Sequence, residues 1–203
     1  MKIYPPEFRK TLLLLAKKVV YHLDMFDLQW TMSGGTLLGA VRAGGFIEHD
    51  YDVDFDYVGP NTDSSYSKLE SLVTYIKEHA ESGLKVANGL PYMLKFKPRL
   101  PLKMVPLFRF DRPGIPNPCV DLFIGEPTPL GRKLIHPKWP KWTYLTSELW
   151  PLQRLKFEDC LWLAPAHPEA ILERYYGPTW ETPIFYDWPE RSTVNADGSS
   201  IAS

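Results

Sequence analysis

The hydrophobic positions near the start of the chain follow the spacing of a helix. From Pro5 to about Asp27, apolar residues recur at steps of three and four, and most of the basic residues fall between them. The apolar set is Phe8, Leu12, Leu15, Val19 and Leu23. This period gathers the set on one side of a helix, so the segment predicts an amphipathic helix that packs on a core.

A short strand, a glycine turn and a second helix are predicted next. Residues 29–32 can form a strand that leads into Ser33-Gly34-Gly35. Thr36 is a candidate cap for a helix that ends at Ala43-Gly44-Gly45, because Thr favours helix starts and Gly favours helix ends. The pattern therefore predicts a strand, a glycine turn and a helix in succession.

The remainder of the chain divides into apolar runs separated by Gly and Pro. Strands are predicted at 51–58, 84–87, 92–96, 105–110 and 120–124, and helices at 64–79 and 167–176. The Pro-rich stretches 113–118 and 127–140 are expected to be ordered loops. Since neither an internal repeat nor a clear linker occurs, we expect one α+β domain over residues 1–190 and a flexible polar tail at 191–203.

Composition and charge narrow the class of protein. The chain has 203 residues, of which 44% are apolar, a formal net charge of −1 and a pI of about 6.5. We expect an ordinary core and no basic field that would attract a nucleic acid polymer. Lys17 and Lys18 interrupt the aliphatic run at 12–16, far short of the ~20 apolar residues that span a membrane. We expect no transmembrane segment and a soluble, cytoplasmic protein.

Cys119 and Cys160 predict two buried, reduced thiols rather than a disulfide.

Four aspartates alternate with apolar residues in the segment EHDYDVDFDYV. In a strand, one face carries Asp50, Asp52, Asp54 and Asp56, and the other carries Tyr51, Val53, Phe55 and Tyr57. Such carboxylates repel one another unless water or a cation screens them. A divalent ion with hard oxygen ligands is one solution, and a solvated strand face is the alternative. An EF-hand loop is excluded, because Phe55 and Asn61 stand where it needs Gly and Glu.

The glycine turn adds a second chemical feature one helix ahead of this strand. Gly34-Gly35-Thr36 falls where backbone N–H groups and the helix dipole can hold a phosphate. Most such turns only reverse the chain, and no P-loop lysine follows this one. Next to a carboxylate strand, however, the turn is what metal-dependent phosphoryl or nucleotidyl transfer needs.

The segment from Gly34 to Phe55, GGTLLGAVRAGGFIEHDYDVDF, resembles the signature of the LicD, fukutin and fukutin-related protein family. The later segments SELWPLQRLKFEDCLWLAP and HPEAILERYYGPTWETP also resemble this family. The likeness spans about Trp30 to Pro183 and is weak between 61 and 118. It departs at His49, where Trp is common, and at Trp150, where Phe is common.

The resemblance implies a nucleotidyltransferase fold of the DNA polymerase beta-like class. In that fold a mixed β-sheet is flanked by helices, and here a Pro/Trp-rich C-terminal section would follow. The resemblance also implies that Asp52, Asp54 and Asp121 are the catalytic and metal-binding residues and hold one or two Mg²⁺ (or Mn²⁺) ions. Gly35 and Thr36 would position a phosphate. A lysine or arginine filling the gap between the carboxylates would argue against such a centre.

The resemblance implies a reaction as well. Characterised relatives move a phospho-alcohol from a CDP-activated donor, such as CDP-choline or CDP-ribitol, to a sugar hydroxyl. The hypothesis for this chain is transfer to a glycan of a lipopolysaccharide or glycoprotein, whose acceptor could be membrane-associated. One alternative is a nucleotidyltransferase that uses an NTP on a small molecule or protein. Another is a non-catalytic regulator that binds a nucleotide or glycan.

Arg42 and Lys133 are further candidates for binding the donor. Arg42 could make a forked contact with a phosphate, with a surface arginine as the alternative. Lys133 and His136 could contact the donor or acceptor, with a surface turn at Gly131-Arg132-Lys133 as the alternative. Aromatic residues such as Trp139, Trp142 and Tyr144 could stack on a base, a sugar or a choline-like cation, although most of them are expected in the core.

The pattern leaves the roles of three residues beside the central aspartates open. Asp50 and Asp56 share the parity of Asp52 and Asp54, yet their positions at the strand ends could leave them in solvent. His49 is expected to pack beside the strand rather than to act near a metal.

Overall fold

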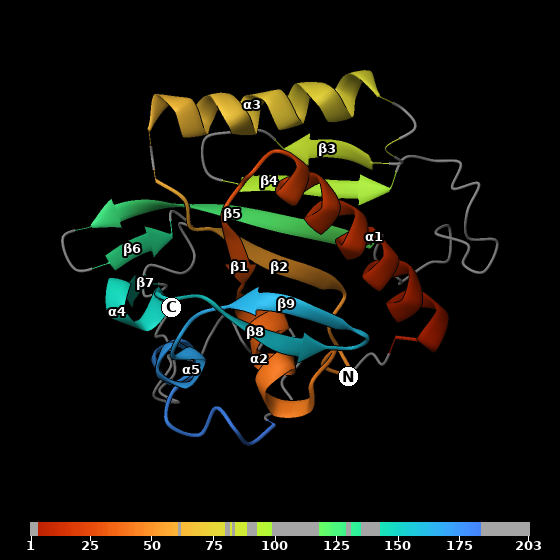
Figure 1. Cartoon of the computed structure of the whole chain (residues 1–203). Coiled ribbons are helices and arrows are strands. Elements are labelled where there is room, and N and C mark those ends of the chain that lie inside the picture. Colours follow the sequence, from red (N-terminus) through yellow and green to blue (C-terminus); the bar gives the residue numbers. More distant parts are fainter. Residues whose placement is uncertain are drawn as a thin grey trace, which may run out of the picture.

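This computed structural model describes residues 4–60, 62–79, 82, 84–88, 93–98, 118–128, 131–134 and 143–183. The fold is α+β, with a mixed sheet of seven strands, a separate two-stranded hairpin and flanking helices (Figure 1). The helices are α1 (Pro6–Met25), α2 (Gly34–Ala43), α3 (Asp63–Glu78), α4 (Thr146–Leu149) and α5 (Pro168–Tyr176). The strands are β1 (Trp30–Met32), β2 (Asp52–Tyr57), β3 (Leu84–Asn88), β4 (Met93–Pro98), β5 (Cys119–Thr128), β6 (Gly131–Leu134), β7 (Thr143–Leu145), β8 (Gln153–Phe157) and β9 (Cys160–Ala164).

Strands β2 and β5 form the parallel centre of the sheet. The strand order is β1-β2-β5-β4-β3, with β6 paired to β5 and β7 paired to β6, and these other pairs are antiparallel. In the β2–β5 register, Asp52 lies beside Cys119 and Asp54 lies beside Asp121. Residues paired in this way share a face of the sheet. Two acidic segments far apart in the sequence are thereby brought to one face.

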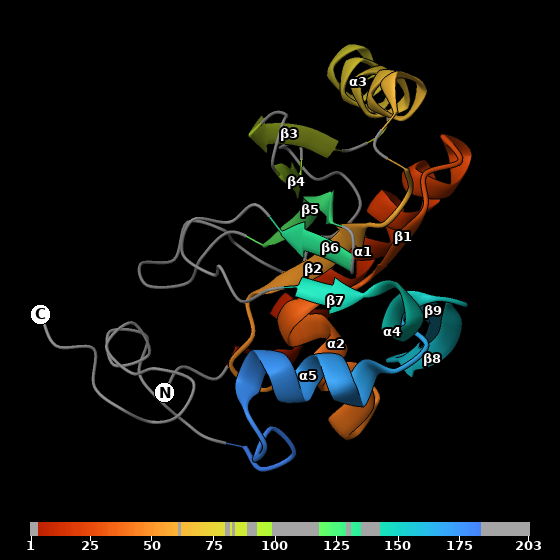
Figure 2. The same ribbon diagram turned by 90° about the vertical axis from the view of Figure 1, so that its left-hand side faces the viewer.

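The other face of β2 and β5 belongs to the hydrophobic core. Val53, Phe55, Val120 and Leu122 have no exposed surface. Helix α1 contacts β2, β4 and β5 and lies on one side of the sheet (Figure 2). Its buried residues include the full set that the spacing of three and four predicts: Phe8, Leu12, Leu15, Val19 and Leu23.

Helix α2 begins earlier than expected, so the prediction that Thr36 caps it is wrong. The N-cap is Ser33, and Gly44 ends the helix in the left-handed conformation with φ +68°. Thr36 lies inside the first turn, where its Oγ1 accepts a hydrogen bond from the backbone N–H of Asp54 at 2.9 Å. The Thr36 side chain therefore attaches the start of α2 to β2.

The C-terminal section contains strands where loops were expected or nothing was predicted. Strand β6 lies within 127–140, so the expectation of a loop throughout that stretch is wrong. The β8–β9 hairpin packs against the loop that follows α2. At its turn, the Glu158 carboxylate accepts a hydrogen bond from the backbone N–H of Phe46 at 2.9 Å, and the Glu158 N–H donates to the carbonyl of Gly44 at 2.7 Å.

Three expected features fall on residues beyond the described ranges. These are the strand at 105–110, the ordered loop at 113–118, of which only residue 118 is described, and the tail at 191–203. They remain predictions, as does the extent of the domain to residue 190.

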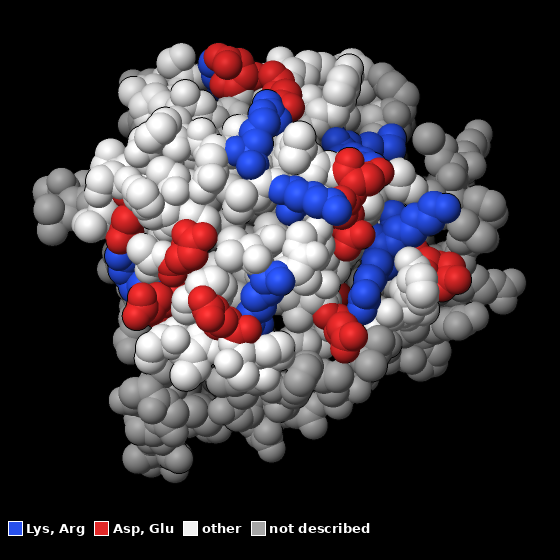
Figure 3. All heavy atoms as spheres, turned by 60° about the horizontal axis from the view of Figure 1, so that its bottom comes forward, with Lys and Arg blue, Asp and Glu red and all other residues white. Residues whose placement is uncertain are grey.

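The surface carries both signs of charge. On the face shown in Figure 3, acidic and basic side chains are interspersed, in keeping with the net charge of −1. Among the helices of the described residues, none has the combined length and apolar character that a membrane crossing requires. Both cysteines are free thiols; Cys119 is buried, and Cys160 is half-buried.

A substitution in α2 tests how closely the helix packs on the loop after it. A Cβ on Gly39 would lie 2.3 Å from the carbonyl oxygen of Gly45, which is backbone and cannot rotate away. We expect Gly39→Ala to lower the free energy of unfolding by about 2–4 kcal/mol, measured by urea denaturation.

The matched control is Gly44→Ala, whose added Cβ would meet only the flexible side chain of Lys156, at 3.8 Å. This variant should lose about 1 kcal/mol, from the left-handed backbone alone. Equal losses in the two variants would contradict the close packing.

Candidate active site

Three possible metal ligands form a cluster where the acidic face of β2 meets β5. A carboxylate oxygen of Asp52, the Sγ of Cys119 and a carboxylate oxygen of Asp121 lie within 4.8 Å of one another. Asp121 is 5% exposed, and Asp52 is partly exposed. The structure thus brings together Asp52 and Asp121, which lie 69 positions apart in the sequence (121 − 52).

Asp54 and Asp50 lie against the start of α2. The Oδ2 of Asp54 is 2.6 Å from the place where a Cβ on Gly34 would stand, and the Oδ2 of Asp50 is 2.5 Å from the corresponding place at Gly35. The two glycines leave room for these carboxylates, whose negative charge suits the positive end of a helix dipole. Asp54 is not part of the three-ligand cluster, although it is adjacent to Asp121 in the register.

This arrangement limits how the glycine turn could hold a phosphate. Gly35 is half-buried and has Asp50 beside it, so a phosphate there would meet a carboxylate. The Thr36 side chain is 2% exposed and already accepts a hydrogen bond from the Asp54 backbone. Any phosphate at this turn would therefore need a cation to screen it from Asp50.

Crowding of the carboxylates changes how they titrate. Burial, and then the charge of Asp121, raises the pKa of Asp52 to about 6, against an opposing effect of Lys95. Burial, and then the charge of Asp52, raises the pKa of Asp54 well above its ordinary value. In the metal-free protein, ionisation of these groups therefore opposes folding.

Lys95 is a site residue that the sequence analysis missed. It is paired with Asp121 between β4 and β5, and its Nζ lies 2.7 Å from the Oδ2 of Asp121 and 3.7 Å from the Sγ of Cys119. Burial lowers the pKa of Lys95, but the hydrogen bond to Asp121 and the charge of Asp121, with smaller contributions from Cys119 and Asp52, together outweigh burial, so the net pKa is raised and the group stays charged. The available signal was the alternation Leu94-Lys95-Phe96, which places the lysine on the face of the strand opposite its two apolar neighbours.

The oxygen ligands at this site fit a divalent cation, and Lys95 competes with such a cation for Asp121. Asp52 and Asp121 offer hard oxygen ligands close enough to share one ion, as Mg²⁺ or Mn²⁺ prefers. Burial, and then the charge of Asp121, raises the pKa of Cys119 to about 12, so its thiol is a poor ligand. Lys95 contacts Asp121 but leaves Asp52 and Asp121 close together. Because Lys95 supplies one positive charge, repulsion alone no longer requires a metal.

Asp56 is buried and takes part in a hydrogen bond within the fold. It is 2% exposed and accepts a hydrogen bond from the Oγ of Ser33 at 2.8 Å. The possibility that this aspartate lies in solvent is therefore excluded. His49 lies half-buried in the turn before β2.

The remaining candidate binding residues lie away from the carboxylates or outside the described residues. Arg42 is in the last turn of α2, at the end opposite Gly34, and its guanidinium donates to the carbonyl of Thr182 at 3.2 Å. The structure does not bring it to the carboxylates. Lys133 belongs to β6, so the expected surface turn at this position is wrong, and its side chain is outside the described part. His136, Trp139 and Trp142 also lie outside it, while Tyr144 is buried in the core.

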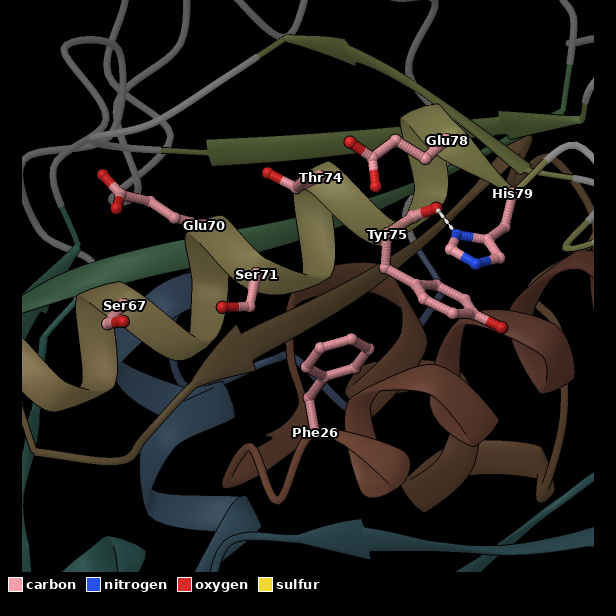
Figure 4. A pocket seen from close by; sticks show the side chains of 8 residues that line it. All are labelled: Phe26, Ser67, Glu70, Ser71, Thr74, Tyr75, Glu78 and His79. Carbon is pink, nitrogen blue, oxygen red and sulfur yellow. Dashed lines mark hydrogen bonds between the residues drawn. The ribbon is translucent and has the colours of Figure 1, made fainter.

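A separate hollow of about 440 Å³ lies along α3, away from the carboxylates (Figure 4). Phe26, Tyr75 and His79 form part of its wall, together with short polar and acidic side chains of α3. The rings of Tyr75 and His79 stack at 4.0 Å, and the Nδ1 of His79 hydrogen bonds with the Tyr75 carbonyl at 2.9 Å. These contacts lie at the C-terminal end of α3 and bring none of the acidic cluster into the hollow, so we place the candidate active site at β2 and β5.

A family model for the LicD/FKTN/FKRP nucleotidyltransferase domain matches residues 27–167. That range covers more than half of the chain and contains the glycine turn, both acidic strands and Lys95. The chain belongs to this family. Its fold is accordingly the nucleotidyltransferase fold, with the mixed sheet around β2 and β5 and helices beside it. LicD membership implies a phosphotransferase-like or nucleotidyltransferase-like activity.

Solved structures of ANT(2'')-Ia also resemble the chain. The crystal structure of ANT(2'')-Ia in complex with adenylyl-2''-tobramycin aligns with 16% identity and a TM-score of 0.48 over 86% of this chain and 79% of that one. The solution structure of the antibiotic-resistance factor ANT(2'')-Ia aligns with 17% identity and a TM-score of 0.39 over 63% of this chain and 54% of that one. Among the curated proteins, none matches this LicD chain.

The different surroundings of Asp52 and Asp56 predict opposite effects on stability. Asp52→Ala removes one of several repelling carboxylates, so we expect metal-free stability at pH 7.5 to stay level or rise by about 1–2 kcal/mol. Asp56→Ala leaves the buried Ser33 hydroxyl without its acceptor and should cost about 1–3 kcal/mol. Urea denaturation in EDTA compares the two; a large loss in Asp52→Ala would show that Asp52 is structural.

The raised pKa of Asp52 also predicts a pH dependence. The folded protein binds this proton more tightly than the unfolded chain, so the contribution of Asp52 favours folding at low pH and is lost as the pH rises through about 6. We expect the Tm in EDTA to fall from pH 4.5 to 7.5, and to fall less in Asp52→Asn. Parallel curves for the two proteins would contradict the raised pKa.

Proposed function

We propose that this LicD chain is a metal-dependent phosphotransferase that moves a phospho-alcohol from a CDP-activated donor to a sugar hydroxyl of a glycan. Phosphocholine and ribitol phosphate are examples of the transferred group, and lipopolysaccharide or glycoprotein biosynthesis is the setting that fits it. Family membership supports the reaction class. The observation that carries the proposal is the approach of Asp52 and Asp121 to within 4.8 Å across parallel strands.

In this proposal Asp52, Asp54 and Asp121 hold Mg²⁺ or Mn²⁺. When bound, the ion would neutralise the donor's diphosphate and the charge that grows on the leaving phosphate. The backbone at Gly35 and the start of α2 would orient a donor phosphate. Lys95 keeps Asp121 directed into the cluster through their 2.7 Å contact.

The proposed transfer is a single displacement at phosphorus. The sugar oxygen forms a bond to the phosphorus of the phospho-alcohol, and the bond from that phosphorus to the CMP oxygen breaks. CMP leaves with the electron pair, and the hydroxyl proton passes to a carboxylate. In this proposal Asp121 accepts this proton.

A panel of thermal-shift measurements tests which donor the protein binds. CDP-choline, CDP-ribitol, CTP, ATP and UTP are each measured with and without Mg²⁺ or Mn²⁺. We expect a rise in Tm of several degrees that needs both the metal and a CDP-alcohol, because ligands that bind only the folded state stabilise it. A preference for an NTP would replace the proposal by nucleotidyl transfer, and stabilisation without metal would contradict the metal centre.

The rate of CMP release in the presence of an acceptor sugar tests the roles of the three aspartates. Asp52→Asn, Asp54→Asn and Asp121→Asn should each lower the rate about 100-fold or more, because each removes charge that acts on the reacting phosphate. Arg42→Ala is the matched control and should keep both the rate and the thermal shift, since Arg42 lies at the far end of α2. A loss of donor binding in Arg42→Ala would restore Arg42 as a phosphate contact.

A further inference from the structure

Lys95 places a positive charge inside the acidic face of the sheet. Its Nζ is 2.7 Å from the Oδ2 of Asp121, and the two side chains are 23% and 7% exposed. A shielded pair of this kind is screened much less by salt than a surface pair. It comes from a fixed register, because β4 and β5 pair these two residues directly. The ammonium is therefore part of the site in the metal-free protein.

A metal ion and this ammonium would compete for the same carboxylate. An ion held by Asp52 and Asp121 needs an oxygen of Asp121, while Lys95 holds Oδ2. Two cations on one carboxylate also repel each other. Lys95 must therefore weaken the binding of a metal that arrives alone.

A diphosphate offers the ammonium another anionic partner. Lysine binds phosphate as a point charge at the end of a flexible stem, so it can move from one anion to another without a change in the backbone. Its neighbour Cys119 accepts a hydrogen bond from Nζ at 3.7 Å, but a neutral thiol sulfur is only a weak acceptor. A metal and a diphosphate that bind together would thus give both the metal and the Lys95 ammonium an anionic partner.

We propose that Lys95 makes metal binding and diphosphate binding depend on each other. It holds Asp121 in the empty site and passes its ammonium to the diphosphate when the metal takes Asp121. Lys95 is then a positioning residue for the metal and a phosphate contact for the donor. The inference rests on the proposed function for the presence of a metal and a diphosphate, but not for the alcohol or nucleoside attached.

Calorimetric titration of Lys95→Met tests both halves of the proposal. With Mn²⁺ alone, the variant should bind about tenfold more tightly than the wild type, because the competing charge is gone. With inorganic pyrophosphate at saturating Mn²⁺, it should bind about tenfold more weakly, because the phosphate has lost its lysine. Lys85→Met is the matched control, since Lys85 is exposed on the neighbouring strand β3, and it should change neither affinity.

Lys95→Gln covers the case in which the methionine variant does not fold. Glutamine keeps a hydrogen-bond donor for Asp121 without the charge, and the same two changes are expected. Unchanged or weaker Mn²⁺ binding in these variants, or unchanged pyrophosphate binding, would overturn the proposal. Pyrophosphate carries no nucleoside or alcohol, so both changes can appear even where the CDP-alcohol panel gives no shift. The failure of one proposal can therefore be told from the failure of the other.

Discussion

The parallel, in-register pairing of β2 and β5 determines where the charges of this protein lie. Burial of Val53 and Phe55 against α1 and the core fixes which face of β2 points inward, and Val120 and Leu122 do the same for β5. The alternate residues must then share the other face, and these are mostly aspartates. The apolar face stabilises the fold while the acidic face opposes it, so the core holds the carboxylates in an arrangement that they would not adopt alone.

The glycine turn is explained by the same constraint. Gly34 and Gly35 face the carboxylate oxygens of Asp54 and Asp50, so a larger residue at either position would have to displace one of these side chains. Thr36 then joins the helix to the backbone of Asp54. The Gly-Gly-Thr sequence thus suits the packing between a helix and an acidic strand, in addition to any role in holding a phosphate.

Local patterns in the sequence predicted the elements that build the site, but not all of their partners. The period of α1, the alternation in β2 and the strand, turn and helix around Gly34 are visible because each is encoded within a few residues. The β8–β9 hairpin was missed because its turn has no Gly or Pro; Glu158 itself adopts a positive φ of 55°. The pair of Lys95 and Asp121 spans 26 positions and depends on strand order, which a single sequence does not display.

Helix α2 is fixed at both ends, and this fixes the geometry of the site. At its start, Ser33 bonds to Asp56 and Thr36 accepts a bond from Asp54, so both contacts attach the helix to the acidic strand. At its other end, the Glu158 carboxylate accepts a hydrogen bond from the backbone N–H of Phe46, so the turn of the β8–β9 hairpin holds the loop that follows the helix. These contacts hold the positive end of the helix at a set distance from the carboxylates, whose negative charge Lys95 balances only in part.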